Sequence, residues 1–550
     1  MTEPAAVELD PFYYLYNFRT LLECVLEQYG DLLNNEEQEF VDTFMELPDP
    51  EQALLVRMYS RRSTLFRSDK LNYTELPPTE HLLPSLQESG LISINPMLPA
   101  EELLELVTCP EMREWWPEQC PKKGNRPFQL EQLAELTSNQ FYDSFPHTLV
   151  EILHQPMIDL FQLLFFGNLA QDLSAFVTVD LGHVRYEPYQ LDSDTRLFRH
   201  RQDIDDSEAI MALRDQFYSS EEFDPDIAQH ILQHLPVLDD NSPVKGRLSR
   251  LCNRIGKGYE QQQMLPEALE AYSFSHRPPA RERRARILFK LEQYEAAENR
   301  CKEIIKNPWN EAESLFAERF QKQCRKQMGH KGPPNRRYTP QTQTLVLPNG
   351  DMRVEQNVLM HLYLEESPCF YVENWLMNTV FGLTFWDAIF APVRGAFTHP
   401  FQRAPHDLFD TEFESKRHPL IESAFDNINS ASWSEQITQR WRDKYGISNP
   451  FVGWYEPGED ILSMALDYIP REHWMAIFRR MLSDLRENCS GFPDLIQFYE
   501  DGSYRLLEVK SPTDKVQPNQ LRWMSMFEQQ GIPYHLLQVK WAEQSIESLS

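Results

Sequence analysis

Several features of secreted and membrane proteins are missing from this chain of 550 residues. No stretch approaches the roughly 20 uncharged apolar residues that a membrane helix needs, so no membrane span is expected. The first residues, MTEPAAVELDPFYY, contain neither a basic nor an apolar signal region, and we expect no secretory signal. The eight cysteines include no CxxC pair, which argues against a zinc ribbon and a disulfide framework. A reducing, cytoplasmic location is therefore predicted.

The chain also lacks the net positive charge that is typical of nucleic-acid-binding proteins, because its formal net charge is −31. The charge is unevenly distributed, however. Residues 57–70 carry five basic side chains, and residues 281–337 carry 15 Lys or Arg against 8 Asp or Glu. Such patches can bind phosphates while acidic surfaces repel other DNA, but solvated helix faces would have the same composition. Charge alone leaves both interpretations open.

The length predicts two to four domains, since one ordinary core does not extend over 550 residues. Residues 1–75 are predicted to form a helical DNA-binding region. Apolar residues there recur at helical spacing: Phe12, Leu15, Phe18, Leu22 and Leu26. Four arginines of this region are candidates for phosphate contact by charge alone: Arg57, Arg61, Arg62 and Arg67.

Residues 76–144 are predicted to form a second DNA-binding region, similar to a SAP module. Two helical segments, EELLELV and FQLEQLAEL, flank the loop CPKKGNRP. This loop contains Lys122, Lys123 and Arg126. A basic loop between helices suits phosphate contact, but KKGNR is equally an ordinary soluble turn.

Residues 145–335 are predicted to be mostly helical, with one β segment at AFVTVDLGHVRYEPY. Two segments 29 residues apart resemble each other, with Leu265 and Ala268 matching Tyr294 and Ala297. A small residue three positions after a bulky one lets paired helices approach, as in helical-hairpin repeats. We therefore predict a TPR-like region, followed by a linker at 329–341.

The stretch that indicates chemistry lies in the last predicted domain, residues 336–550. Two β-rich segments, LIQFY and SYRLLEVK, are joined by a turn at Asp501-Gly502. A two-residue loop would point the side chain of Asp494 away from Glu508. A three-residue loop with Gly502 in the left-handed conformation places Asp494 opposite Glu508, and Lys510 then shares their face.

The three-residue loop would bring together groups that can cut a phosphodiester. Two carboxylates with β-carbons about 5 Å apart can share a hard divalent cation. A neighbouring ammonium can orient water or stabilise negative charge. Pro493-Asp494 followed by Glu508-x-Lys510 is the pattern of the PD-(D/E)xK nucleases, in which a metal activates water. A surface hairpin with ordinary charges is the alternative.

A helix and a strand are predicted to complete an α/β core after this hairpin. Pro518 suits the first turn of the helix, and Gly531 is expected to end it. The strand PYHLLQVKW follows. Gln520, one turn into the helix, either faces the metal site or is solvated.

Beyond the motif, the chain resembles the Fanconi-associated nuclease family, whose catalytic module is the VRR-NUC domain. The resemblance begins with Lys510 followed by SPTDK and Gln520. It extends over most of the chain through VEQNVLMHLY, VENWLMNTVFGLTFWDAIF, VRGAF, ESKRHPLIE, RMYSRRSTLFRSDKLNYTE and VTVDLGHVRYEPY. Because no cysteines match the N-terminal zinc finger of the larger eukaryotic proteins, a bacterial-type member is indicated.

The resemblance implies a multi-domain α+β fold, with helical N-terminal and TPR-like regions followed by a C-terminal α/β VRR-NUC nuclease domain. It implies a structure-selective 5′-flap endonuclease with 5′-to-3′ exonuclease activity in interstrand crosslink repair. Mg²⁺ or Mn²⁺ is the implied cofactor, and the implied metal ligands are Glu373, Asp494, Glu508 and the Val509 carbonyl. Lys510 and Gln520 complete the catalytic set. From sequence alone, Glu373 would be a solvated helix residue.

Branched or 5′-flapped DNA is therefore the expected partner, and the protein is expected to meet it at the nucleoid. The sequence does not decide the protein partners or the choice between monomer and dimer. Two other functions were weighed. A junction resolvase or general exonuclease on the same core would not need the long helical N-terminal part. A TPR-like scaffold with an inactive nuclease fold would not need to retain Asp494, Glu508 and Lys510.

Overall fold

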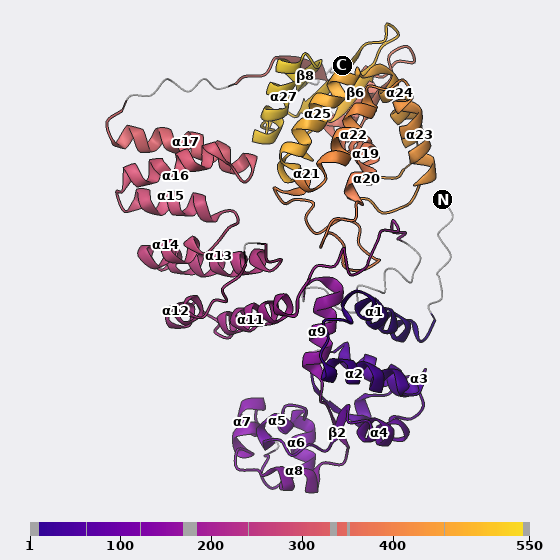
Figure 1. Cartoon of the computed structure of the whole chain (residues 1–550), viewed down its shortest axis with the longest axis vertical. Helices are drawn as coiled ribbons and strands as arrows, with labels where there is room; N and C mark the ends of the chain where they lie inside the picture. Colours follow the sequence, from indigo (N-terminus) through magenta and orange to yellow (C-terminus); the bar gives the residue numbers. More distant parts are fainter. Residues whose placement is uncertain are drawn as a thin grey trace, which may run out of the picture. The chain divides into compact units, whose positions relative to one another are not determined.

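The structure is a computed structural model (Figure 1) that describes residues 10–61, 63–121, 123–168, 184–239, 241–330, 338–348, 352–455 and 457–542. The chain divides into two compact units, Met1–Arg185 with Leu191–Arg196, and Tyr186–Gln190 with Leu197–Ser550. Most of the predicted β segment at 175–189 and of the predicted linker lies outside the described residues. No helix in the described part of the chain is long and apolar enough to cross a membrane.

The first unit is mainly helical. Its helices are α1 (Tyr13–Tyr29), α2 (Asn35–Glu46), α3 (Asp49–Tyr59), the 3-10 helix η1 (Ser68–Lys70), α4 (Thr79–Glu88), α5 (Ala100–Leu104), α6 (Cys109–Trp115), α7 (Arg126–Gln132), α8 (Ser138–Ser144) and α9 (Gln155–Phe166). Three antiparallel strands form a sheet in the order β1-β3-β2: β1 (Leu65–Arg67), β2 (Ile92–Ile94) and β3 (Leu149–Ile152).

Helix α1 confirms most of the apolar stripe predicted for it. Leu15, Phe18 and Leu22 are buried. Leu26 is 39% exposed, and Val25 is buried instead, so this part of the prediction was wrong. The buried stripe continues three residues after Leu22 rather than four, which the 3.6-residue period of a helix allows equally.

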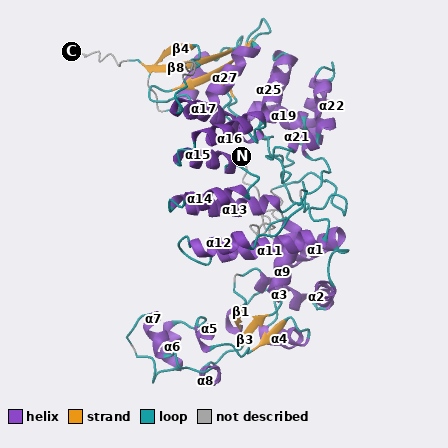
Figure 2. Cartoon of the chain, turned by 60° about the vertical axis from the view of Figure 1, so that its left-hand side comes forward, coloured by secondary structure: helices purple, strands orange, loops and turns teal. Residues whose placement is uncertain are grey.

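The second unit begins with helices that stack in pairs (Figure 2). They are α11 (Arg201–Tyr218), α12 (Pro225–Gln233), α13 (Lys245–Gln261), α14 (Leu265–Ser273), α15 (Ala280–Lys290), α16 (Tyr294–Lys306) and α17 (Glu311–Gln327). Gln263 and Glu292 have φ angles of 62° and 61° in the turns before α14 and α16. Ala268 and Ala297 are fully buried at matching positions. The repetition predicted at a spacing of 29 residues is therefore confirmed.

The rest of the second unit is built around a five-stranded sheet. The strands are β4 (Thr342–Leu347), β5 (Cys369–Tyr371), β6 (Leu495–Phe498), β7 (Tyr504–Lys510) and β8 (Tyr534–Trp541). Their order is β4-β8-β7-β6-β5. The pairs β4–β8 and β7–β8 are parallel, and the pairs β6–β7 and β5–β6 are antiparallel.

Ten helices in the described part of the chain accompany this sheet. They are α18 (Val354–Leu362), α19 (Trp375–Thr384), α20 (Trp386–Ile389), α21 (Phe413–Lys416), α22 (His418–Ile428), α23 (Trp433–Asp443), α24 (Gly458–Tyr468), α25 (Arg471–Ser483), α26 (Leu485–Asn488) and α27 (Pro518–Gln530). Helix α27 begins at Pro518, and Gly531 follows its end with a φ of +70°, as predicted. The predicted order of hairpin, helix and strand is confirmed.

The two faces of β7 have different surroundings. Leu507 and Val509 belong to a buried core with Leu495 and with Val358 of α18. Because successive side chains of a strand alternate, Glu508 points to the opposite face. There it meets Gln520 of α27.

Glu311 joins helix α17 of the paired helices to helices that accompany the five-stranded sheet. Its carboxylate lies 3.0 Å from Arg480 of α25 and 3.5 Å from Arg522 of α27. Its main-chain N–H donates a 2.8 Å hydrogen bond to Asp484. These bonds tie the paired helices to the same helix that carries Gln520.

Candidate active site

The β6–β7 hairpin has the register that the three-residue loop predicts. Leu495 pairs with Leu507, and Phe498 pairs with Tyr504. The N–H of Tyr499 donates to the carbonyl of Ser503 at 2.9 Å, which closes the loop. Gly502 has a φ of +84°, where a side chain would be strained. Continued by one residue, this register sets Asp494 opposite Glu508, and the prediction is confirmed.

Asp494 is fixed by its neighbours on two sides. Its Oδ2 accepts a 2.8 Å hydrogen bond from the N–H of Val509. Its carbonyl accepts hydrogen bonds from the N–H groups of Val372 and Glu373 at 2.8 and 2.9 Å. Asp494 therefore connects the hairpin to the segment that follows β5, although the two lie more than a hundred residues apart.

Glu373 lies in the turn before α19, two residues ahead of its first residue Trp375. The prediction that it belongs to the helix itself was wrong. The physical reason is the pair of hydrogen bonds to the Asp494 carbonyl, which hold the main chain at residues 372–373 against the hairpin. The side chain is exposed at this point.

Glu508 is the buried centre of the site, with an exposed fraction of 1%. Its Oε1 lies 2.7 Å from the Lys510 ammonium and accepts a 2.6 Å hydrogen bond from the Gln520 amide. Gln520 is itself oriented, because its Oε1 accepts a hydrogen bond from the N–H of Gln517 at 2.9 Å. Gln520 therefore faces Glu508 rather than solvent. The second carboxylate oxygen, Oε2, is buried and has no hydrogen-bond partner among the residues that the structure describes.

The electrostatics of the site favour a cation. Burial, together with the nearby charge of Asp494, raises the pKa of Glu508 to about 8 against the opposing effect of Lys510. Burial likewise raises the pKa of Asp494 to about 6, although the Val509 N–H and Lys510 favour its charged form. The raised pKa values show that burial disfavours the charged form of both carboxyls, and that Lys510 offsets this effect only in part.

The donor set fits a hard divalent cation. Glu373, Asp494 and Glu508 offer carboxylate oxygens, which Mg²⁺ and Mn²⁺ prefer. The buried Oε2 of Glu508 without a partner is an acceptor that such an ion would satisfy. As they stand, no three or more Asp, Glu, His or Cys side chains of the described residues are arranged to hold a metal ion. The carboxylate of Glu373 is hydrogen-bonded to the Tyr371 hydroxyl through Oε2.

Three polar residues near the site were missed by the sequence analysis. The Tyr371 hydroxyl donates to Oε2 of Glu373, and the Asn374 amide donates to its Oε1 at 3.4 Å. Glu355 of α18 contributes to the raised pKa values of Asp494 and Tyr371, after burial and other neighbours. Glu355 lies within VEQNVLMHLY, but nothing in its local pattern distinguishes it from a solvated helix residue.

Two of the arginines proposed for DNA contact form ion pairs with carboxylates of the same chain. Arg57 is paired with Glu75 and lies over the Tyr14 ring, 3.9 Å from its centroid. Arg67 is only 5% exposed, and its guanidinium lies 2.9 Å from Asp69 and 2.8 Å from Glu111. A phosphate would have to compete with these carboxylates, so DNA contact by Arg57 and Arg67 stays a prediction.

The other basic residues predicted to contact DNA differ in their hydrogen bonds and in whether the structure describes them. Arg61 donates to the Tyr73 hydroxyl at 2.6 Å. Arg126 donates to the carbonyls of residues 104, 105 and 107 at the end of α5, which is a capping arrangement. Lys123 is exposed, and Arg62 and Lys122 lie outside the described residues. Their roles in DNA binding also stay predictions.

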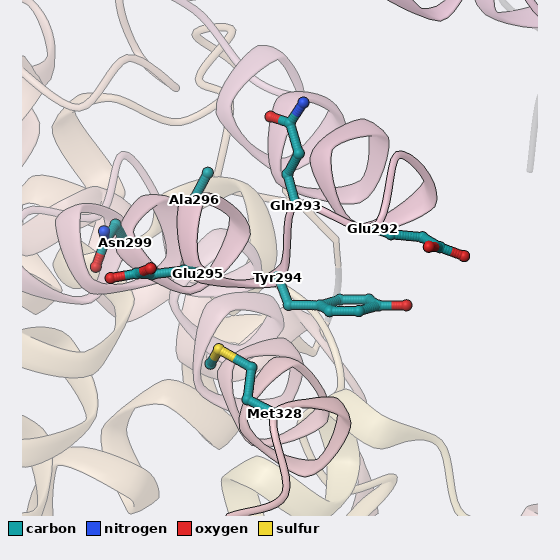
Figure 3. Close-up of a pocket in the computed structure, with 7 residues that line it drawn as sticks. All are labelled: Glu292, Gln293, Tyr294, Glu295, Ala296, Asn299 and Met328. Carbon is teal, nitrogen blue, oxygen red and sulfur yellow. The ribbon is translucent and has the colours of Figure 1, made fainter.

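A shallow pocket at the turn between α15 and α16 contains none of these residues (Figure 3). Glu292 and Glu295 line it together with Met328. Its two carboxylates are exposed and no lysine among the described residues lines it, whereas the hairpin site combines the buried Glu508 with Lys510. The hairpin site is therefore the better candidate for chemistry on nucleic acid.

Comparison with known proteins identifies the family. Residues 429–541 match the model of the VRR-NUC domain, and residues 12–93 match the model described as FAN1, HTH domain. The chain is 36% identical to the Fanconi-associated nuclease 1 homolog of Pseudomonas aeruginosa, over 97% of this chain and 96% of that protein. The chain belongs to the Fanconi-associated nuclease family. It is accordingly a DNA nuclease, and so a hydrolase.

More distant relatives and solved structures agree with membership of this family. The Fanconi-associated nuclease 1 homolog of Oryza sativa subsp. japonica is 24% identical over 93% of this chain and 61% of its own length. A crystal structure of paFAN1 bound to DNA with a two-nucleotide 5′ flap and a gap matches 98% of this chain and all of that one. Its TM-score is 0.82 at 34% identity. The predicted mixed fold with a C-terminal VRR-NUC domain is confirmed.

Proposed function

We propose that this nuclease cuts 5′-flapped and other branched DNA by metal-dependent hydrolysis, with 5′-to-3′ exonuclease action, in interstrand crosslink repair. Nuclease domains of this type generally depend on a metal, and we propose Mg²⁺ or Mn²⁺ for this chain. The preference for a 5′ flap is supported by the relative whose crystal structures contain 5′-flapped DNA. Action on chromosomal DNA implies a cytoplasmic, nucleoid-associated location.

The observation that carries the proposal is the hairpin register. It sets Asp494 opposite Glu508, with Lys510 at the Glu508 carboxylate. The main-chain bonds to Asp494 add Glu373 from a distant segment. A surface hairpin of ordinary charges would not bury Glu508 to 1% exposure or leave one of its oxygens without a partner.

Each residue has a proposed role. Glu373, Asp494, Glu508 and the Val509 carbonyl would hold the cation. When bound, it supplies Lewis acidity toward the phosphate and lowers the pKa of attacking water. Lys510 orients the water or stabilises negative charge that develops on the phosphate. Gln520 fixes the Glu508 carboxylate through its 2.6 Å hydrogen bond, and thereby keeps it in position.

The raised pKa values make stability depend on pH. Between the ordinary values of 3.8 and 4.5 and the raised values of about 6 and about 8, the folded chain binds more protons at Asp494 and Glu508 than the unfolded chain. The metal-free protein is therefore expected to lose stability as pH rises through this window. Cation binding needs deprotonated carboxylates, so Mn²⁺ should raise the melting temperature more at about pH 8.5 than at about pH 5.5. Equal shifts in thermal denaturation at both pH values would contradict this expectation.

Substrate choice tests the proposed specificity. We expect a 5′-flapped duplex to be cut at least about ten times faster than a blunt duplex or a four-way junction, which corresponds to about 1.4 kcal/mol in the barrier. The measurement is single-turnover cleavage of end-labelled substrates of the same sequence. Equal rates on all three would favour a general nuclease, and faster cutting of the junction would favour a resolvase.

A further inference from the structure

Tyr371 contacts a proposed metal ligand without being one itself. It is the last residue of β5, which is one of the two edge strands of the sheet, and it pairs there with Leu495 of β6. Tyr371 is 43% exposed, so its side chain is packed against neighbouring residues only in part. The specific interaction of the side chain is the hydrogen bond from its hydroxyl to Oε2 of Glu373. The hydroxyl therefore restricts the conformation of the Glu373 side chain.

The side chain of Glu373 needs such a constraint more than those of the other proposed ligands do. Glu508 is buried and held by Lys510 and Gln520, and Asp494 accepts the N–H of Val509. Glu373 is fixed to Asp494 through its main chain only, and its exposed side chain would otherwise sample several rotamers. Holding one long side chain in one rotamer costs conformational entropy, unless a neighbour has already ordered it.

We infer that Tyr371 is a positioning residue that orders the Glu373 carboxylate for cation binding. This inference rests on the proposed function of the site. The hydroxyl is bonded to Oε2, whereas within the described part of the chain Oε1 has only the longer 3.4 Å hydrogen bond from Asn374 and is available to the ion. Partners that orient ligating side chains typically contribute 10- to 100-fold to metal affinity, and such an effect is expected from this phenol.

The test is Mn²⁺ binding to the full-length Tyr371→Phe variant, measured by calorimetry without DNA. We expect the dissociation constant for Mn²⁺ to rise about 10- to 100-fold. The concentration of Mn²⁺ that gives half-maximal cleavage should rise together with the dissociation constant. This rise should be a larger fold-change than the fall in kcat at saturating Mn²⁺. Tyr499→Phe is the matched control, because the Tyr499 hydroxyl donates a 3.0 Å hydrogen bond to Gln497 within the β6–β7 hairpin and does not bond to a proposed metal ligand. It should bind Mn²⁺ as the wild type does.

A double-mutant cycle separates positioning from a general structural effect. If Tyr371 acts through Glu373, adding Tyr371→Phe to Glu373→Ala should weaken Mn²⁺ binding by less than about twofold, because alanine leaves no carboxylate for the hydroxyl to orient. Wild-type affinity in Tyr371→Phe, or full additivity in the double variant, would overturn the inference and leave the proposed function intact. Absence of metal-dependent cleavage by the wild type would overturn both.

Discussion

Asp494→Asn should abolish cleavage of 5′-flapped DNA while the affinity for that DNA stays within about threefold of wild type. Asparagine is nearly isosteric and can still accept the N–H of Val509, which Asp494 accepts at 2.8 Å, so the hairpin should keep its register. It removes the negative charge that faces Glu508 and is proposed to bind the metal. The loss should be on the order of 10³-fold or more, since metal activation supplies several kcal/mol of transition-state stabilisation.

The control for this variant is Asp501→Asn, at the exposed turn of the same hairpin. Asp501 accepts the N–H and hydroxyl of Ser503 at 2.9 and 2.6 Å, and an amide oxygen can replace it. Cleavage should remain within about twofold of wild type. Single-turnover kinetics and a binding titration in Ca²⁺ measure the two properties separately. A purified Asp494→Asn protein that cuts at the wild-type rate would show that the site is assigned to the wrong residues.

Arg417→Met should destabilise the second unit by about 3–5 kcal/mol, because it leaves a buried carboxylate without its partner. The Arg417 side chain has no exposed surface and makes two 2.8 Å hydrogen bonds to Asp407. It also lies over the Phe413 ring, 4.3 Å from its centroid. The pair anchors the segment between α20 and α21 to the start of α22. Denaturant unfolding followed by tryptophan fluorescence reports the change.

A surface pair provides the comparison for this buried one. Arg479 binds Glu422 through two hydrogen bonds of 2.7 and 2.8 Å, but its side chain is 44% exposed. Arg479→Met should therefore cost only about 0–1 kcal/mol. Replacing both members of the buried pair, Arg417→Met with Asp407→Leu, should recover much of the lost stability. A loss of less than about 1 kcal/mol in Arg417→Met would contradict the account of this pair.

The sequence was sufficient for the hairpin because its geometry is local. Once Gly502 takes the left-handed position of a three-residue loop, the two-residue period of a strand places Asp494 opposite Glu508. Pro518 and helical spacing placed Gln520 one turn into the helix, but left open whether it faces the site, as the structure shows, or solvent. The repeat was equally visible, since Ala268 and Ala297 lie at equivalent positions of short helix pairs.

The rest of the site depends on contacts between distant segments. Glu373 reaches Asp494 through main-chain hydrogen bonds, which no side-chain pattern records, and only the family resemblance drew attention to it. Tyr371 is an ordinary edge-strand residue in the sequence, and its hydrogen bond becomes visible only in three dimensions. The number of basic residues could not show whether Arg67 is available to DNA, because the sequence does not reveal its ion pairs with Asp69 and Glu111.

The central claim is that the hairpin site hydrolyses branched DNA with a divalent cation. The most direct measurement is cleavage of a 5′-flapped duplex by the wild-type protein, with Mn²⁺ and then with excess chelator, and with the cut positions mapped on both strands. We expect incision near the flap junction in Mn²⁺ and none in chelator. Incision that persists in chelator, or no incision of any branched substrate in Mn²⁺, would contradict the account.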